Sequence, residues 1–362
     1  MSRKLESDKI LFGVVLGLVL LGLLMVYSAT AELGAERYHS AYHFILPQLA
    51  WAVVGLAGMA VLMNLDYRRL RSPMLIFPAM GAQLLLLIVA LLTPASHNAH
   101  RWVRLQPLSF EPSELSKLVL VLFLAYFLDL RKGQVNDLAH TVAPLGLLTG
   151  LTVALILKQP DLGTALAILF TVLAMFFTAG ARLVYFLVPV LASLPMFYFF
   201  VYRVPWRWSR MLVFFDPTLD PLGKGFQPLQ AKMAVATGGI MGVGLMEGRE
   251  KLFYLPDAHN DYIFGVISEE MGFVGAVLVV ALFAIILWRG LRAARCRDNF
   301  GRLLAIGLTA LIVGQALVNM SVVLSLLPAK GLPLPFVSCG GSALLIDLLA
   351  AGILLNISQH GT

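Results

Sequence analysis

The stretch ILFGVVLGLVLLGLLMVY, residues 10–27, decides the fold class of this chain. It carries no charged residue over a length that can cross the bilayer, which takes about 17–25 helical residues. The Ala29-Thr30-Ala31 sequence that follows resembles a signal-peptide cleavage site. The apolar part of a signal peptide is shorter, however, at about 7–15 residues. We therefore predict an uncleaved transmembrane helix.

Further apolar runs of similar length recur along the whole chain. Hydrophobic residues make up 59% of the 362 residues and charged residues only 13%, whereas soluble domains carry about 25% charged residues. Lipid must therefore cover much of the apolar surface. The sequence predicts an all-α polytopic membrane protein, a single domain over residues 1–362 with about ten transmembrane helices. The predicted spans are residues 10–27, 44–63, 73–92, 115–130, 141–157, 164–179, 183–201, 262–288, 303–326 and 342–357.

Basic residues predict how the helices are oriented. They precede the first span and follow the second, fourth, sixth and eighth spans, so they share one side of the membrane. The positive-inside rule makes that side cytoplasmic, and both termini are then cytoplasmic. Cys296 and Cys339 fall on opposite faces, so we expect no disulfide between them. The basic residues are Arg3, Lys4, Lys9, Arg68, Arg69, Arg71, Arg131, Lys132, Arg182, Arg289, Arg292, Arg295, Arg297 and Arg302.

A large extracytoplasmic loop, residues 202–261, separates the seventh and eighth predicted spans. Loops of this length usually have a function or fold back into the bilayer. The net charge of +7 could indicate nucleic-acid binding. Basic residues in membrane proteins usually set the topology instead, and the chain has no zinc spacing or RNA-binding signature. We therefore expect no nucleic-acid partner.

Polar residues within or beside the spans gather on the outer face of this predicted topology. Charged groups there are costly, so each one is a candidate functional residue. Glu114 and Lys117 lie three residues apart, hence on one face of the fourth helix. The other candidates come from distant segments: Arg101, Trp102, Lys158, Asp161, Arg210, His259, Asp261 and Ser338.

Two interpretations of these residues stay open. Taken singly, each could be an interfacial anchor or a member of a structural ion pair, and Trp102 is typical of an interfacial aromatic belt. Taken together, they indicate a cationic pocket with carboxylates that opens near the outer lipid headgroups. Such a pocket suits an anionic, lipid-linked substrate, because Lys and Arg side chains neutralise phosphate charge.

Four of the polar segments resemble the motifs of one family, in the same order. They are HRWVRLQPLSFEPSELSK (100–117), LKQPDLGTALA (157–167), KLFYLPDAHNDYIFGVISEEMGFVG (251–275) and AKGLPLPFVSCGGSALL (329–345). They resemble the SEDS peptidoglycan glycosyltransferases (shape, elongation, division and sporulation proteins) over residues 10–357. Members of that family have ten transmembrane helices and a large extracytoplasmic loop between helices seven and eight, which agrees with the independent count of apolar runs.

The resemblance implies an enzyme that polymerises lipid II into glycan strands at the outer face of the cytoplasmic (inner) membrane. A sugar hydroxyl attacks the lipid-linked donor, and undecaprenyl diphosphate leaves. The KLFYLP, AKGLPLPF and AGARL (179–183) stretches are closer to the division branch than to the elongation branch, which favours septal synthesis. The resemblance also implies a class B penicillin-binding protein (a transpeptidase) as partner, and other divisome or elongasome proteins. Asn260 replaces a common Thr, and Glu111 a common Gln.

The resemblance further identifies Asp261 with the catalytic aspartate of the family. We hypothesise that Asp261 acts as general base, or helps to bind a divalent cation, Mg²⁺ or Mn²⁺, on the diphosphate. The alternative is a helix N-cap. The remaining substrate-binding candidates have these expected roles: Lys117, Arg101, Lys158 and Arg210 as diphosphate contacts, Glu114 as a partner of Lys117, Trp102 as a sugar platform, His259 as a ligand, base or structural residue, and Asp161 and Ser338 as further contacts.

Two carboxylates outside this set are expected to be structural. Glu269 follows Asp261 by eight residues on the predicted eighth span, and Asp347 is buried within the tenth. Three rival functions stay open: an elongation-type polymerase, a flippase for lipid II or another anionic lipid, and a non-catalytic scaffold. A flippase needs polar groups that reach through the midplane. The outer-face clustering of the charges therefore favours an enzyme.

Overall fold

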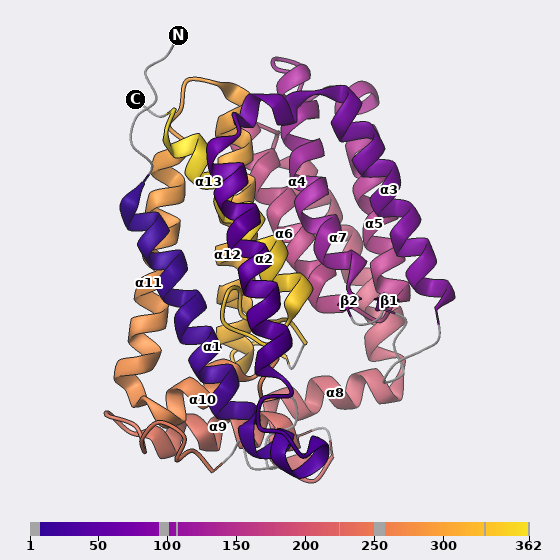
Figure 1. Ribbon diagram of the computed structural model, residues 1–362. Helices are drawn as coiled ribbons and strands as arrows, with labels where there is room; N and C mark the ends of the chain where they lie inside the picture. Colours follow the sequence, from indigo (N-terminus) through magenta and orange to yellow (C-terminus); the bar gives the residue numbers. More distant parts are fainter. Residues whose placement is uncertain are drawn as a thin grey trace.

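The protein is a bundle of helices, seen here in a computed structural model (Figure 1). The structure describes residues 8–93, 101–105, 108–223, 225–249, 258–328 and 331–360, and at a few of these, among them Arg210, the main chain alone. Both ends of the chain lie at the same end of the bundle, and α8, α9 and α10 lie at the opposite end. We call the latter the distal end.

The elements follow one another along the chain as a series of mostly long helices. The helices are α1 (Lys9–Tyr38), α2 (Ile45–Asn64), α3 (Pro73–Leu92), α4 (Pro112–Leu130), α5 (Ala143–Lys158), α6 (Leu162–Ala179), α7 (Val184–Phe197), α8 (Pro205–Phe215), α9 (Phe226–Gly238), α10 (Ile263–Glu270), α11 (Gly272–Ala293), α12 (Asn299–Val323) and α13 (Gly341–Ser358). The short turns are η1 (Tyr67–Arg71), η2 (Leu138–Val142), η3 (Tyr198–Tyr202) and η4 (Pro217–Leu219).

Eight helical segments of the described chain are long and apolar enough to cross a membrane. They are α1, α2, α3, η2 with α5, α6, α11, α12 and α13. Two of the predicted spans, residues 115–130 and 183–201, are not among these eight. α4 has 19 residues but carries Glu114, Lys117 and Asp129, and α7 has 14 residues that η3 continues. The all-α, polytopic class is confirmed, and the number of ten spans stays a prediction.

The eighth predicted span, residues 262–288, was wrong as a single helix. It consists of α10 and α11, which meet at a break between Met271 and Gly272. Gly272 has a φ of 66°, a conformation that glycine adopts without the penalty a Cβ would bring. The first N–H groups of α11 are satisfied from outside, because Phe273 and Val274 donate to the carbonyls of Gly239 and Ile240 at 2.9 and 3.2 Å. The segment after α9 thus fills the break.

The predicted outer loop, residues 202–261, contains α8, η4 and α9, and α8 lies across the distal end of the bundle (Figure 1). A second departure is a short hairpin between α3 and α4. Its strands β1 (Val103–Leu105) and β2 (Leu108–Phe110) are antiparallel and pair Val103 with Phe110. This hairpin is the one sheet in the described chain, and its small size leaves the fold class unchanged.

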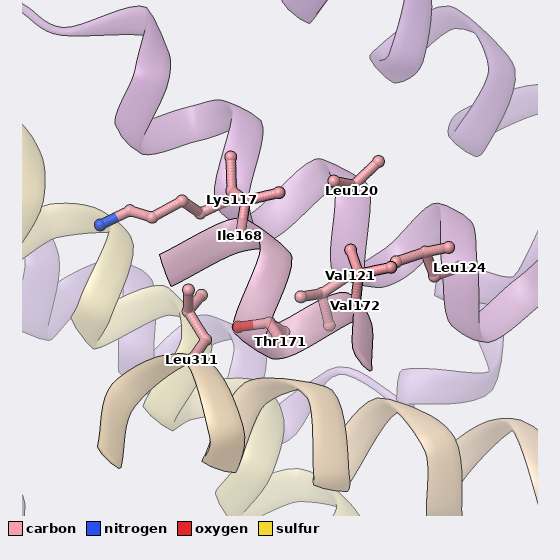
Figure 2. A pocket seen from close by; sticks show the side chains of 8 residues that line it. All are labelled: Lys117, Leu120, Val121, Leu124, Ile168, Thr171, Val172 and Leu311. Atoms are coloured by element: carbon pink, nitrogen blue, oxygen red, sulfur yellow. The ribbon is translucent and has the colours of Figure 1, made fainter. Parts of the chain in front are cut away.

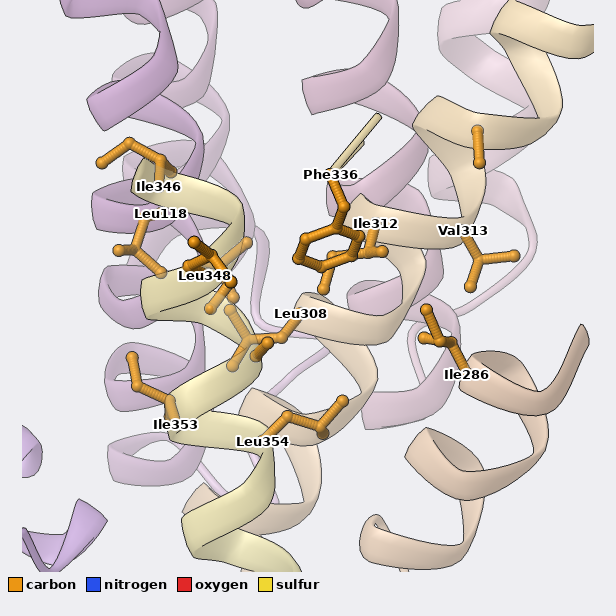
Figure 3. Close-up of a cluster of buried hydrophobic side chains, with 14 of the residues drawn as sticks. Leu118, Ile286, Leu308, Ile312, Val313, Phe336, Ile346, Leu348, Ile353 and Leu354 are labelled. Carbon is orange, nitrogen blue, oxygen red and sulfur yellow. The ribbon is translucent and has the colours of Figure 1, made fainter. Parts of the chain in front are cut away.

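α4, α12 and α13 form the centre of the bundle. In α12 and α13, 78% of the most apolar window is buried, against 22% in α2 on the outside. Figure 3 shows the packing between α12 and α13, where Leu308 of α12 lies close to Leu348 of α13, and Ile312 of α12 lies beside Phe336. Two of these helices carry part of the candidate site, Glu114 and Lys117 on α4 and Gln315 and Asn319 on α12, so that part of the site is deeply buried.

Candidate active site

A buried ion pair lies in the first turns of α4. The helix begins at Pro112, a residue that favours the first helical position. One turn further, Lys117 Nζ lies 2.7 Å from Glu114 Oε2, and both residues are 1% exposed. An unpaired charge would be very unfavourable there, so each ion stabilises the other. The predicted pairing of Glu114 with Lys117 is therefore present.

Lys117 also connects α4 to α12. Its ammonium donates to Gln315 Oε1 at 2.6 Å, and Gln315 Nε2 donates in turn to the Pro333 carbonyl at 2.8 Å. Figure 2 shows that the ammonium points away from the apolar side chains of a narrow crevice between α4, α6 and α12, among them Leu120 and Val172. The Lys117 ammonium is thus connected, through Gln315, to the segment that contains Pro333.

That segment, residues 331–340, links α12 to α13, and we call it the cradle loop. Buried amide side chains from two helices bind its main chain. Asn319 Nδ2 donates to the Leu332 carbonyl at 2.7 Å. Gln48 Nε2 donates to the Ser338 carbonyl, and Gln48 Oε1 accepts from the Gly340 N–H, both at 3.1 Å. The cradle loop is therefore fixed by side chains that the neighbouring helices supply.

The cradle loop in turn holds residues 259–261, which we call the Asp261 turn. Three consecutive carbonyls of this turn accept hydrogen bonds: His259 from the Cys339 N–H at 2.9 Å, Asn260 from Ser338 Oγ at 2.5 Å, and Asp261 from Asn319 Nδ2 at 2.8 Å. The main chain that carries Asp261 is consequently fixed just before α10 begins. Ser338 Oγ also accepts from the Leu334 N–H at 2.8 Å, so its hydroxyl holds the turn.

The Asp261 carboxylate lies directly over Gly331 of the cradle loop. A Cβ added at Gly331 would come within 2.7 Å of Asp261 Oδ2, so this close approach requires glycine. The helix N-cap role considered for Asp261 is not observed, because Tyr262 occupies that position in α10. His259 packs against Phe44, with 5.4 Å between the ring centroids.

The second group of predicted residues lies around the turn between α5 and α6. The Arg101 guanidinium donates to the Gln159 carbonyl at 2.9 Å and to the Pro160 carbonyl. Asp161 caps α6 by accepting from the Thr164 N–H at 3.1 Å. Arg101 and Asp161 therefore stabilise this turn, whereas Lys158 at the end of α5 is exposed. Trp102 is half-buried beside Arg101, and Arg210 lies in α8 with its side chain outside the described part.

Glu111, at the N-cap position of α4, is a carboxyl that shares this environment. Burial, together with the nearby charges of Glu114 and Asp161, raises the pKa of Glu111 to about 8, against an ordinary value of 4.5. Arg101 and Lys117 act in the opposite direction. At neutral pH this carboxyl therefore holds its proton, which limits the negative charge where α4 begins.

The residues that the structure describes do not form a complete metal site by themselves. Among them, no three His, Cys, Asp or Glu residues gather closely enough to hold one. Mg²⁺ prefers six oxygen ligands and usually keeps several waters, binding one or two carboxylates plus substrate phosphates. A divalent ion at Asp261 would therefore need most of its ligands from elsewhere.

Several residues of the site were not predicted. Gln315 and Asn319 lie four residues apart on one face of α12, and Gln48 lies near the start of α2. The available signal was an amide side chain inside an otherwise apolar span, which is as unusual there as a charge. A search for charged residues alone does not find these positions, because the amide side chains are neutral.

The two extra carboxylates have structural contacts. Glu269 accepts from the Arg249 N–H at 2.7 Å. Its neighbour Glu270 accepts from Ser28 Oγ of α1 at 2.7 Å and from the Met246 N–H at 3.1 Å. Both thus tie the segment after α9 to α10, in agreement with the structural role predicted for Glu269. Asp347 is buried in α13, as predicted.

Comparison with known proteins then assigns the family. Residues 8–362 match the Cell cycle protein family that groups FtsW, RodA and SpoVE. The chain belongs to this family. Among members of the FtsW, RodA and SpoVE family, a probable peptidoglycan glycosyltransferase FtsW of Geobacter metallireducens is 41% identical, and the match covers 98% of this chain and 95% of that protein. The stage V sporulation protein E of Bacillus subtilis is 37% identical, with 99% of each chain covered.

Solved structures of the same family share the fold. One belongs to a peptidoglycan synthase complex described as coordinating polymerization and crosslinking, with a TM-score of 0.80, 33% identity and 98% of both chains covered. Another is the rod shape determining protein RodA of Thermus thermophilus, with a TM-score of 0.71, 30% identity and 98% of both chains covered. The overall arrangement of the helices is therefore that of the family.

Proposed function

We propose that this chain is a peptidoglycan glycosyltransferase that polymerises lipid II into glycan strands, for septal wall synthesis in cell division. The names of its relatives support the reaction, and those of the FtsW relatives support the septal role over elongation. The observation that carries the proposal is the Asp261 turn, where hydrogen bonds to three main-chain carbonyls hold the backbone that carries the Asp261 carboxylate beside the cradle loop. The whole chain acts as one membrane domain.

In this reaction the Asp261 carboxylate accepts the proton of the acceptor-sugar hydroxyl. The hydroxyl oxygen forms a bond to the anomeric carbon of the donor as the bond from that carbon to the diphosphate breaks. The electron pair of the broken bond leaves with undecaprenyl diphosphate. Cationic side chains stabilise the charge of the leaving group, and the candidate is Lys158, which is exposed at the end of α5 beside the turn that Arg101 binds. The Glu114–Lys117 pair is buried, and Gln315 connects it to the cradle loop.

We infer the orientation from the basic residues and from where the ends of the chain lie. Both ends lie opposite the distal end (Figure 1), and the positive-inside rule makes their side cytoplasmic. The site then faces outward from the inner membrane, where lipid-linked sugars are displayed. A transpeptidase of the penicillin-binding class is the partner that we propose, because one similar structure belongs to a complex that couples polymerization with crosslinking.

A flippase is the rival that the packing disfavours. A flippase needs a polar path that continues through the bundle. Between the central helices the described core is instead filled by apolar side chains, such as Leu308, Leu348 and Ile353 (Figure 3). This tight packing suits an enzyme whose site is open to one side.

Purified protein given fluorescent lipid II tests the proposal, with and without the partner transpeptidase. We expect glycan ladders, and we expect Asp261→Asn to reduce the rate by about 10²–10⁴-fold, the usual contribution of a positioned base. A chelator arm tests whether Mg²⁺ or Mn²⁺ takes part. A correctly folded Asp261→Asn protein with normal ladders would refute the assignment of the base. Movement of lipid II across liposomes without ladders would favour the flippase.

A further inference from the structure

We infer that Asn319 and Gln315, one helical turn apart on α12, are positioning residues that set the location of the Asp261 carboxylate. The inference rests on the proposed transferase function and extends it to residues that touch neither substrate nor the reacting atoms. Both amides lie in an apolar span and are 1% exposed. Asn319 binds main-chain carbonyls of both segments that meet at Asp261, and Gln315 binds a main-chain carbonyl of one of them, the cradle loop.

Asn319 joins the two segments with one amino group. Its Nδ2 donates to the Asp261 carbonyl at 2.8 Å and to the Leu332 carbonyl at 2.7 Å. The two N–H bonds of that group are thus both used, one for the Asp261 turn and one for the cradle loop. The separation of the Asp261 main chain from the cradle loop is therefore set by a single planar group.

Gln315 brings the ion pair into the same arrangement. Its Oε1 accepts from Lys117 Nζ, and its Nε2 donates to the Pro333 carbonyl, the residue next to Leu332. A shift of Lys117 is therefore passed to the cradle loop through one rigid amide. The cradle loop lies against the Asp261 carboxylate at Gly331, so the position of the carboxylate depends on both α12 amides.

The expected functional effect is large because catalysis is sensitive to small displacements. A misplacement of about 1 Å can lower a rate by about 100-fold. Neither amide contacts the substrate in this arrangement, so their loss should lower kcat while leaving the KM for lipid II nearly unchanged. A merely structural role would lower the stability of the protein and leave kcat unchanged.

Asn356 offers a matched control at the opposite end of the bundle. It is also a buried asparagine, in α13, and it also binds main chain: its Nδ2 donates to the Met63 carbonyl at 2.8 Å, and its Oδ1 accepts from the Tyr67 N–H at 2.9 Å. Asn319→Leu and Asn356→Leu should lower the melting temperature to similar extents. We expect only Asn319→Leu to lower kcat, by about 100-fold.

Gln315 supplies a second and independent variant, in case Asn319→Leu fails to fold. Gln315→Met removes both hydrogen bonds, whereas Gln315→Glu keeps an acceptor for Lys117 and loses the donor to Pro333. We expect kcat to fall in both, and to fall further in Gln315→Met. Equal kcat values for Gln315→Met and the wild-type protein would overturn the inference for Gln315.

The chain also carries its own reporter of the cradle loop. Cys339 is half-buried in that loop, and its N–H binds the Asp261 turn. In a Cys296→Ser background, the rate at which maleimide alkylates Cys339 measures how often the loop opens. We expect this rate to rise in Asn319→Leu and not in Asn356→Leu, and equal rates in the two variants would contradict the inference. This readout needs no lipid II.

The two proposals fail in different ways. If the wild-type protein makes no glycan even with its partner, the transferase function fails, and the alkylation rates still report on the hydrogen bonds. If the wild-type protein is active and Asn319→Leu keeps the kcat of Asn356→Leu, the function stands and the positioning role is refuted.

Discussion

Gly331 and Gly340, at the two ends of the cradle loop, differ sharply in what a methyl group would meet. At Gly331 the added Cβ would lie 2.7 Å from Asp261 Oδ2, whereas at Gly340 the nearest atom is Ala343 Cβ at 3.5 Å, an ordinary contact. Gly331→Ala should therefore displace the carboxylate and lower kcat by about 10–100-fold. Gly340→Ala should retain nearly full activity. Polymerisation rates of the two variants measure the difference, and equal rates would contradict the close approach described for Gly331.

The Glu114–Lys117 pair predicts an effect on stability that depends on which partner remains. Lys117→Met leaves a buried carboxylate without its cation, which costs about 3–5 kcal/mol. The double variant Glu114→Gln with Lys117→Met removes both charges and should recover most of that loss. Thermal unfolding of the wild-type protein and these two variants in detergent measures this coupling. A double variant as unstable as Lys117→Met would show that the two charges do not depend on each other.

Glu111 predicts a pH dependence of stability. The pKa of its carboxyl is about 8 in the folded protein and 4.5 ordinarily. Between these values the folded state keeps a proton that the unfolded state has released. Stability should therefore fall as the pH rises from about 4.5 to about 8, and this contribution should be constant above that range. Glu111→Gln should remove this part of the pH dependence. Melting temperatures of both proteins over the pH range provide the measurement.

How much of the site was predictable depended on the kind of residue. Charges in apolar surroundings are rare, so Glu114, Lys117 and Asp261 could be selected from the sequence. The pairing of Glu114 with Lys117 followed from helical spacing. That Arg101 binds the turn between α5 and α6 could not be predicted, because it depends on where two distant segments meet. For the same reason the hydroxyl of Ser338 was expected on the substrate and is found on the Asn260 carbonyl.

At the scale of elements, apolar runs predicted most helices within a few residues, and α3 has the predicted bounds. The break between α10 and α11 was missed, because hydropathy continues through it and Gly272 alone carries no distinguishing pattern. α8 and α9 were missed for another reason. They lie in a loop whose mixed composition gives no span, although α8 has a marked apolar face. Tertiary contacts decide both cases.

The break itself is testable with a second pair of glycines. Gly272→Ala would strain a residue at a φ of 66° and would bring its Cβ to 2.3 Å from the Gly242 nitrogen. We expect a loss of more than about 1 kcal/mol, from the left-handed conformation alone. Gly81→Ala, in α3 where the added Cβ meets nothing within 4 Å, should be neutral or stabilising by up to about 1 kcal/mol. Thermal unfolding compares the two, and similar losses would argue against a strained junction.

At the scale of the whole molecule, the orientation in the membrane predicts which face labels from outside. Leu222, at the distal end between η4 and α9, is 91% exposed, and Lys132 is exposed after α4 near the opposite end. In a background without Cys296 and Cys339, a membrane-impermeant maleimide should label Leu222→Cys in intact spheroplasts. It should label Lys132→Cys only after lysis. The reverse pattern would invert the proposed topology.

The three hydrogen bonds to the Asp261 turn all end on carbonyl oxygens of the main chain. A backbone oxygen is present whatever residue the gene encodes, so the scaffold does not depend on the identity of the side chains at 259 and 260. Substitutions at these two positions can change the side chains that contact a substrate without moving Asp261. A different side chain at 260 would leave this attachment intact, because Ser338 Oγ binds the carbonyl of that residue. The side chains at this turn can therefore change in evolution, and with them the contacts to the acceptor sugar, while Asp261 keeps its position.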